Sequence, residues 1–161
     1  MQIVFLIMIK IQNNRSGCPV STALELIGDK WTLVIIRDLF LQNITFKDFM
    51  NSPEKISSNI LTNRLKKLKK YNLINFFANP EDKKIKYYYL REAGVNLYPM
   101  IYNLSIWSKK NISMAFNSTA VEWYDENLNK EQEISIKETI DSYKIFRNNL
   151  MKQFKVQHSE S

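Results

Sequence analysis

Hydroxyl and amide side chains recur on one side of the segment 57–71. Such groups can read DNA, because Asn bonds bidentately to adenine while Ser or Thr serves either a base or a phosphate. Leu61, Leu65 and Leu68 form an apolar seam, so a helix here would bury one side and expose the other. The residues predicted to contact bases or phosphates are Ser57, Ser58, Asn59, Thr62, Asn63, Arg64 and Lys66, of which Arg64 and Lys66 suit the phosphate backbone.

A lysine-rich hairpin is predicted directly after this helix. Residues 73–78 and 85–90 are apolar and aromatic, and the turn-forming sequence 79–82 lies between them. A winged helix places one helix in a major groove and a basic loop beside it. We therefore expect Lys83, Lys84 and Lys86 to follow the minor groove or flanking phosphates. The alternative is a charged turn that only keeps the surface soluble.

Positive charge is concentrated in the same part of the chain. The net charge is +7 and the pI about 9.4, and residues 1–116 hold 17 Lys or Arg against 8 Asp or Glu. Residues 117–161 hold 6 against 8. This distribution suits a surface that binds a polyanion, although lysines that merely solvate a surface would give a similar pI.

The elements that must position these residues carry local signals. Thr22 and Glu25 predict a capping box before a short helix that stops at Gly28, and Asp29 can cap the next helix, 30–41, which is apolar on most sides. Thr45 with Asp48 predicts a second box opening a helix over 46–51. Ser57 caps the polar helix, so two short helices joined by a tight turn form a helix-turn-helix.

The segment after the hairpin is predicted to be helical. Residues 92–116 form one helix bent at Pro99, with a stripe at Leu97, Ile101, Leu104 and Trp107 that is either core or a dimer contact. Residues 117–129 are a connector, residues 131–154 form an amphipathic helix, and the tail from His158 is disordered.

Other classes of protein find little support. A single histidine, His158, and three glycines leave no metal-ligand cluster, no phosphate loop and no catalytic pair, so we expect neither an enzyme nor a metal or cofactor. One cysteine excludes an internal disulfide and favours the cytoplasm. No stretch reaches the ~18 apolar residues of a membrane span. The apolar start, 1–11, is an edge strand, part of a dimer interface, or an extension ahead of Met8.

An ordered set of motifs resembles the HxlR-type regulators, a bacterial winged-helix group related to MarR regulators. The matching residues are Cys18-Pro19, Leu26 to Thr32, Phe46 to Phe49, Ile56 to Leu65, Tyr71 to Ile74, Tyr89-Leu90, Gly94 and Trp107. The chain departs from the family at Gln42-Asn43-Ile44, Thr45, Asn72 and Arg91. Asn72 replaces a usual glycine, and Asn is the commonest substitute at a left-handed helix C-cap.

The resemblance implies a homodimer whose terminal helices form the dimer contact and whose two reading helices meet successive major grooves of double-stranded DNA. Such regulators act as repressors or activators. It also implies redox sensing through Cys18, whose place before Pro19 and a helix start, with Arg15 nearby, favours the thiolate. The alternative is a small buried side chain. No effector is named by the sequence.

The predicted fold is therefore α+β, mainly α: a winged helix-turn-helix with a two-stranded wing and flanking dimerisation helices. The predicted divisions are an N-terminal extension (1–17), the DNA-binding domain (18–116) and a C-terminal helical extension (117–161). Two other functions stay open. One is a winged-helix module that binds proteins. The other is a small-molecule sensor with an aromatic pocket, for which the candidates are Trp31, Tyr98, Trp107 and Trp123.

Overall fold

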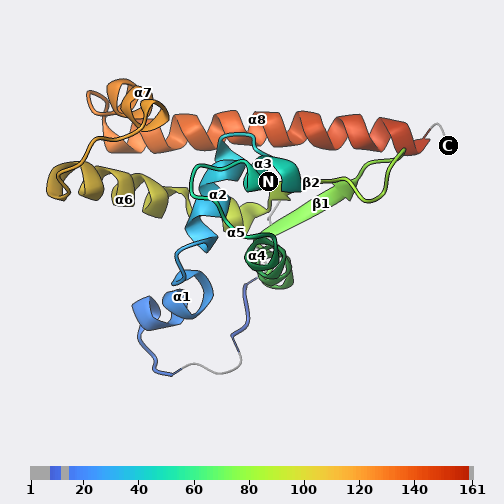
Figure 1. Ribbon diagram of the computed structural model, residues 1–161, viewed down its shortest axis with the longest axis horizontal. Helices are drawn as coiled ribbons and strands as arrows, with labels where there is room; N and C mark the ends of the chain where they lie inside the picture. Colours follow the sequence, from blue (N-terminus) through green and yellow to red (C-terminus); the bar gives the residue numbers. More distant parts are fainter. Residues whose placement is uncertain (1–7, 12–14, 160–161) are drawn as a thin grey trace, which may run out of the picture. The chain divides into compact units, whose positions relative to one another are not determined.

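The structure is a computed structural model that describes residues 8–11 and 15–159, with side chains described as far as residue 154. Its elements are α1 (Pro19–Ile27), α2 (Thr32–Phe40), α3 (Phe46–Met50), α4 (Ser58–Lys70), β1 (Ile74–Ala78), β2 (Lys86–Leu90), α5 (Glu92–Val95), α6 (Tyr98–Asn111), α7 (Ser118–Asn127) and α8 (Gln132–Ser159) (Figure 1). The chain divides into two compact units at the junction of Asn96 and Leu97. The predicted fold class, mainly helical with a two-stranded sheet, is confirmed.

The first unit is built around α2. Ile36 and Leu39 of this helix are fully buried together with Leu61 of α4, as expected for a helix that is apolar on most of its sides. Asp29 accepts hydrogen bonds from the backbone N–H groups of Trp31 and Thr32, both at 3.0 Å. The helix starts at Thr32 with Trp31 at the N-cap position, so Asp29 lies two residues ahead of the cap it was predicted to form.

The helix-turn-helix begins with the predicted capping box. The Thr45 hydroxyl accepts from the backbone N–H of Asp48 at 3.1 Å, and the Asp48 carboxylate accepts from the Thr45 N–H at 2.8 Å. Ser57 caps α4 by accepting from the Ile60 N–H. After α4, Asn72 has a φ of 62°, which confirms the predicted left-handed residue at the helix end.

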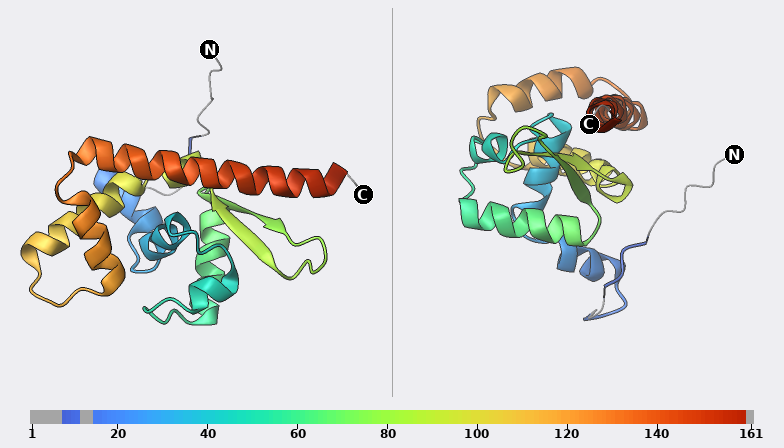
Figure 2. Two further views of the ribbon diagram at one scale, coloured as in Figure 1. Left: turned by 90° about the horizontal axis from the view of Figure 1, so that it is seen from above. Right: turned by 90° about the vertical axis from the view of Figure 1, so that its right-hand side faces the viewer.

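The wing is an antiparallel hairpin in which β1 pairs with β2 (Figure 2). Phe76 lies opposite Tyr88, so both rings share the face of the hairpin that carries the buried Leu90. A third short segment joins this sheet. Thr45 forms a β-bridge with Tyr87, and the Ile44 carbonyl accepts from the Tyr88 N–H at 2.7 Å. This bridge ties the start of α3 to the wing.

The predicted start of the first helix is wrong. α1 begins at Pro19, with Cys18 as its N-cap and no capping side chain. Proline suits this position because it has no N–H to leave unpaired. Thr22 lies inside α1, where its hydroxyl donates to the Cys18 carbonyl at 3.0 Å, so it does not occupy the N-cap position of the predicted capping box. The alternatives for the apolar start of the chain fall largely on residues 1–7, outside the described ranges.

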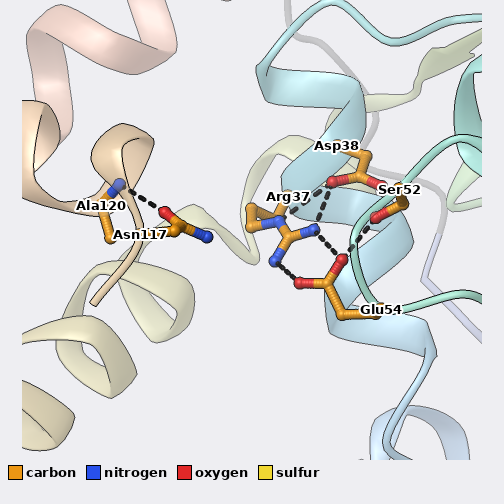
Figure 3. Close-up of polar contacts among 6 residues, drawn as sticks. All are labelled: Arg37, Asp38, Ser52, Glu54, Asn117 and Ala120. Atoms are coloured by element: carbon orange, nitrogen blue, oxygen red, sulfur yellow. Dashed lines mark hydrogen bonds and ion pairs between the residues drawn. The ribbon is translucent and has the colours of Figure 1, made fainter. Parts of the chain in front are cut away.

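The single helix predicted over 92–116 is also wrong. The structure has the short α5 and then α6, and Pro99 lies in the first turn of α6 instead of bending the middle of a helix. The connector predicted over 117–129 is instead α7, capped by Asn117, whose side chain accepts from the Ala120 N–H at 2.9 Å (Figure 3). Asn is a strong N-cap residue, and that signal was present in the sequence.

The second unit consists of α6, α7 and α8. Aromatic side chains join α7 to α6: Trp123 contacts Tyr102 edge-on at 5.2 Å and its indole N–H donates to the Tyr98 hydroxyl at 3.3 Å. The Tyr124 hydroxyl donates to the Ser105 carbonyl at 2.8 Å. α8 is 28 residues long and buries Tyr143, among others, on its inner side. None of the helices in the described ranges has the length and apolarity to cross a membrane.

Gly94 has no room for a side chain. A Cβ at this position would lie 2.2 Å from the Leu73 carbonyl oxygen, which accepts from the Arg91 N–H at 2.9 Å. We expect Gly94→Ala to lower the free energy of unfolding by about 1–3 kcal/mol through overpacking. Urea unfolding measures the loss. Gly17→Ala is the control, since nothing lies within 4 Å of a Cβ there. Equal midpoints for the two variants would contradict the packing described.

Candidate nucleic-acid interface

The exposed side of α4 presents a row of short polar side chains. Leu61, Leu65 and Leu68 are buried and hold the opposite side of the helix against the first unit. A helix with three buried positions at this spacing must turn the remaining positions outward. The exposed residues of the predicted set are Ser57, Ser58, Asn59, Asn63 and Lys66, and Thr62 is partly exposed.

Asp29 fixes one edge of α4. Its carboxylate lies 3.0 Å from Nε of Arg64 and 4.0 Å from Nζ of Lys67. Burial alone would raise the pKa of Asp29, but hydrogen bonds from Thr32 and Trp31 and the charge of Arg64 outweigh burial and lower it. The ionised carboxylate therefore ties the α1–α2 junction to α4. Arg64, predicted to contact the DNA backbone, is engaged by this ion pair.

A second cluster holds the turn between α3 and α4. Arg37 of α2 donates to both Glu54 oxygens, at 2.6 and 3.1 Å, and to the buried carboxylate of Asp38, at 2.6 and 3.0 Å (Figure 3). The Ser52 hydroxyl also donates to Glu54. We call these four residues the Arg37 cluster. It joins α2 to the turn that precedes α4.

The members of the Arg37 cluster have pKa values shifted in different directions. Hydrogen bonds from Arg37 and Ser52 lower the pKa of Glu54 to about 2, although burial opposes the shift. Burial raises the pKa of Asp38 despite the same arginine. The Arg37 pKa is raised, because its two acidic neighbours outweigh its own burial. Glu54 is thus the group whose charge the fold stabilises most clearly.

We expect Glu54→Gln to lower the free energy of unfolding by about 2 kcal/mol at neutral pH, since a charge-assisted pair with Arg37 is lost. The folded pKa of Glu54 lies below its usual 4.5, so this contribution is complete above that pH and is lost as the pH falls toward 2. Urea unfolding of wild type and variant should therefore show a difference in the free energy of unfolding that becomes smaller between pH 5 and pH 3.

The control for this change is Glu138→Gln, which breaks an exposed ion pair with Lys130 and should leave the free energy of unfolding close to that of wild type. A gap between Glu54→Gln and wild type that stays constant with pH would contradict the assigned role.

The tip of the wing is an ordered turn that carries lysines. The Asn79 side chain accepts from the N–H groups of Glu81 and Asp82, and the Asp82 carboxylate accepts from the Lys84 N–H at 2.9 Å. Lys83 and Lys84 are exposed beyond this turn. The predicted wing lysines are therefore displayed by a structured loop, and the third of them, Lys86, lies partly buried on β2.

A groove of 640 Å³ lies between α3, α4 and the wing, and we call it the α4–wing groove. Within the described ranges, none of the lysines that line it forms an ion pair with a carboxylate. They are Lys47, Lys66, Lys69, Lys84 and Lys86. Sequence reasoning missed Lys47 and Lys69, because only the folded wing brings them beside the predicted residues.

Cys18 is exposed at the N-terminal end of α1. Its backbone N–H donates to the Ser16 hydroxyl at 3.3 Å. Arg15, which was expected to act on the thiol, instead forms an ion pair with Glu25. Val20 and Leu24, one helical turn apart, are exposed on the same helix. The thiol is therefore accessible, and the predicted alternative of a buried cysteine is wrong.

The predicted stripe on α6 divides between two environments. Leu104 and Trp107 are 50% and 58% exposed, whereas Leu97 and Ile101 are partly buried. Met100, which the sequence prediction omitted, is 41% exposed. With about 3.6 residues per turn, Met100, Leu104 and Trp107 share one side of the helix. We call these three residues the α6 apolar face.

Residues 26–116 match the model of the HxlR-like helix-turn-helix family. The chain is 31% identical over 94 residues to YdeP of Bacillus subtilis, which is named an HTH-type transcriptional regulator, and the match covers 58% of this chain and 73% of YdeP.

Two solved structures share the fold. The crystal structure of PA1607 is 27% identical with a TM-score of 0.57, covering 65% of this chain and 72% of that one. The reduced form of the transcriptional regulator YodB from B. subtilis is 25% identical with a TM-score of 0.50, covering 63% and 100%.

Proposed function

Because this chain belongs to the HxlR-like helix-turn-helix family, a family of transcription regulators, we propose that it is a dimeric, sequence-specific DNA-binding regulator that works in the cytoplasm. The observation that carries the proposal is the exposed polar row of α4 beside a wing whose lysines have no acidic partners within the described ranges. No relative among those compared is named as an enzyme.

The reading side of α4 combines side chains of two kinds. Asn59 and Asn63 can recognise base edges, while Ser58, Thr62 and Lys66 suit bases or phosphates beside them. All are exposed or partly exposed on one helix. The three wing lysines would grip the backbone next to this contact. Arg64 stays a predicted contact to the DNA backbone. Its Nε pairs with Asp29, so the other guanidinium nitrogens would make that contact.

The competing function is a winged helix that binds another protein. The two differ in their response to salt, because phosphate neutralisation releases counterions. The association constant for a labelled duplex is measured by fluorescence anisotropy at several salt concentrations. Its logarithm should fall linearly with the logarithm of the salt concentration, with a slope of about −0.9 for each phosphate neutralised. A chain that binds no duplex at any salt concentration would overturn the proposal in favour of protein docking.

Dimerisation through α6 is the second part of the proposal. α7 leaves the α6 apolar face uncovered. Its Trp123 contacts Tyr98 and Tyr102 on the other side of α6. A second copy of the chain would cover it, with Leu97 and Ile101 at the edge of the contact. A dimer doubles the phosphate contacts and requires an inverted repeat in the DNA.

The third part is thiol sensing. Cys18 is exposed, and as the chain's single cysteine it can form a disulfide only between subunits or with a small thiol. We expect diamide to weaken DNA binding by wild type at least about tenfold, and Cys18→Ser to keep full binding under the same treatment. Anisotropy before and after dithiothreitol measures both. A Cys18→Ser protein that still releases DNA in diamide would end this part of the proposal.

The remaining alternative was a sensor with an aromatic pocket. Trp123 and Tyr98 bond to each other, Tyr102 contacts Trp123, and Trp107 is on the exposed side of α6. The hollow beside Trp31 is only 10 Å³. These observations favour a packing role for Tyr98 and Trp123, and they place Trp107 outside any aromatic pocket.

A further inference from the structure

The α4–wing groove has an aromatic floor that DNA binding does not require. Phe46, Phe76 and Tyr88 contribute rings to it. Phe46 is 36% exposed and Ile85, also in the groove, is 40% exposed. Phosphate groups need cations, not exposed apolar surface. Apolar surface gathered in a hollow is typical of a small-molecule site, and 640 Å³ lies within the usual range of such sites.

Two of the five lysines that line the groove lie over one ring of that floor. Nζ of Lys69 lies 4.4 Å from the centroid of Phe76, and Nζ of Lys86 lies 4.5 Å from the same centroid. Two ammonium groups around one ring repel each other, and no carboxylate in the described ranges pairs with either. An anion that contacts both ammonium groups would relieve this repulsion.

The kind of anion follows from the number of donors. Five ammonium groups and the Thr62 hydroxyl line the groove. A phosphate monoester carries nearly two charges at neutral pH and presents three acceptor oxygens, so it can serve several of these donors at once. The rings beside them suit an aryl group, which gains from burial against other rings.

We propose that the α4–wing groove binds an aryl phosphate monoester, with its phosphate at Lys69 and Lys86 and its aryl group against the aromatic floor. Thr62, Lys66, Lys84 and Lys86 belong both to the groove and to the predicted DNA-contacting set. The bound ester therefore competes with the DNA backbone. This regulatory consequence rests on the proposed function, whereas the binding itself does not.

Isothermal titration calorimetry of the full reduced chain without DNA tests the site. The probe is 1-naphthyl phosphate. One control is 1-naphthol, which has the aryl group without the phosphate, and the other is inorganic phosphate, which lacks the aryl group. We expect one ester per chain and at least about tenfold weaker binding of each control. An ester that does not saturate, or inorganic phosphate that binds equally well, would overturn the proposal.

Variants separate the groove from the general positive field. Lys69→Gln with Lys86→Gln should weaken ester binding at least about tenfold, whereas Lys110→Gln with Lys152→Gln removes the same charge elsewhere and should change it by less than about twofold. Ile85→Ser keeps every charge and should weaken binding about threefold or more by removing apolar contact. Equal losses in both double variants would overturn the site.

Competition is measured by anisotropy with a labelled duplex. The ester should release the duplex from wild type at concentrations near its own dissociation constant, and 1-naphthol should not. If the ester binds by calorimetry and the duplex stays bound, competition is overturned. If the duplex never binds, the proposed function fails, while calorimetry still decides whether the groove is a ligand site.

Discussion

Replacing Leu104 and Trp107 together by glutamate is expected to convert the proposed dimer into a monomer and to lower DNA affinity by about a hundredfold or more. Both side chains are at least half exposed in the single chain, so glutamate is tolerated by the fold. In the dimer the new charges would face apolar surface and each other. Loss of the second DNA-binding unit removes an avidity gain of about 10²–10⁴.

Sedimentation equilibrium measures the oligomeric state of the protein, and fluorescence anisotropy measures its affinity for DNA. Ile145→Glu is the matched control, because Ile145 is an exposed apolar residue of α8 and lies outside the α6 apolar face. The control should stay dimeric and bind DNA normally. A double variant that remains dimeric, or a wild-type chain that is a monomer at every concentration, would contradict the assigned interface.

Replacing Asn63 by alanine is expected to cost about 1–3 kcal/mol in binding to the preferred sequence and to relax the preference at one base pair. The side chain is exposed on the outer side of α4 and has an amide that can bond bidentately to adenine. Affinity for unrelated sequences should change little, because those complexes depend on phosphate contacts.

Competition anisotropy against a panel of single-base variants of the preferred site measures this preference. Asn148→Ala, an exposed asparagine of α8, is the control and should alter neither affinity nor preference. Uniform weakening of Asn63→Ala on every sequence would show that Asn63 contacts a phosphate, and the base-reading role would be withdrawn.

The helix-turn-helix and wing were predictable because their signals are local. The capping box at Thr45 and Asp48, the apolar seam of α4 and the left-handed Asn72 each lie within a few residues of the feature they determine. The hairpin likewise follows from two apolar runs around a turn. These elements place the polar row of α4, so its exposure could also be deduced from the sequence.

The tertiary parts of the site could not be predicted in this way. Arg37 and Glu54 are 17 residues apart, and nothing in either local sequence indicates their pairing. The groove required the positions of Lys47, Lys69 and Phe76, which belong to three different elements. Side chains at such separations are brought together only by packing of the whole unit.

The errors in prediction have physical causes of their own. Pro19 can start a helix without a capping side chain, and this outweighed the Thr22 signal. Pro99 suits the first turn of a helix better than its interior, where it would remove a hydrogen bond, so 92–116 divides into two helices. In α7 the Asn117 cap and the aromatic contacts of Trp123 outweigh a composition that suggested a connector.

Selection from a random duplex DNA library with the reduced, purified chain, followed by sequencing, tests the central claim most directly. A dimer reading DNA through two copies of α4 predicts an enriched inverted repeat with half-sites about one helical turn apart. The enriched duplex would then serve as the probe for the Asn63, Cys18 and α6 variants. No enrichment, with only salt-sensitive bulk binding, would contradict sequence-specific reading by α4.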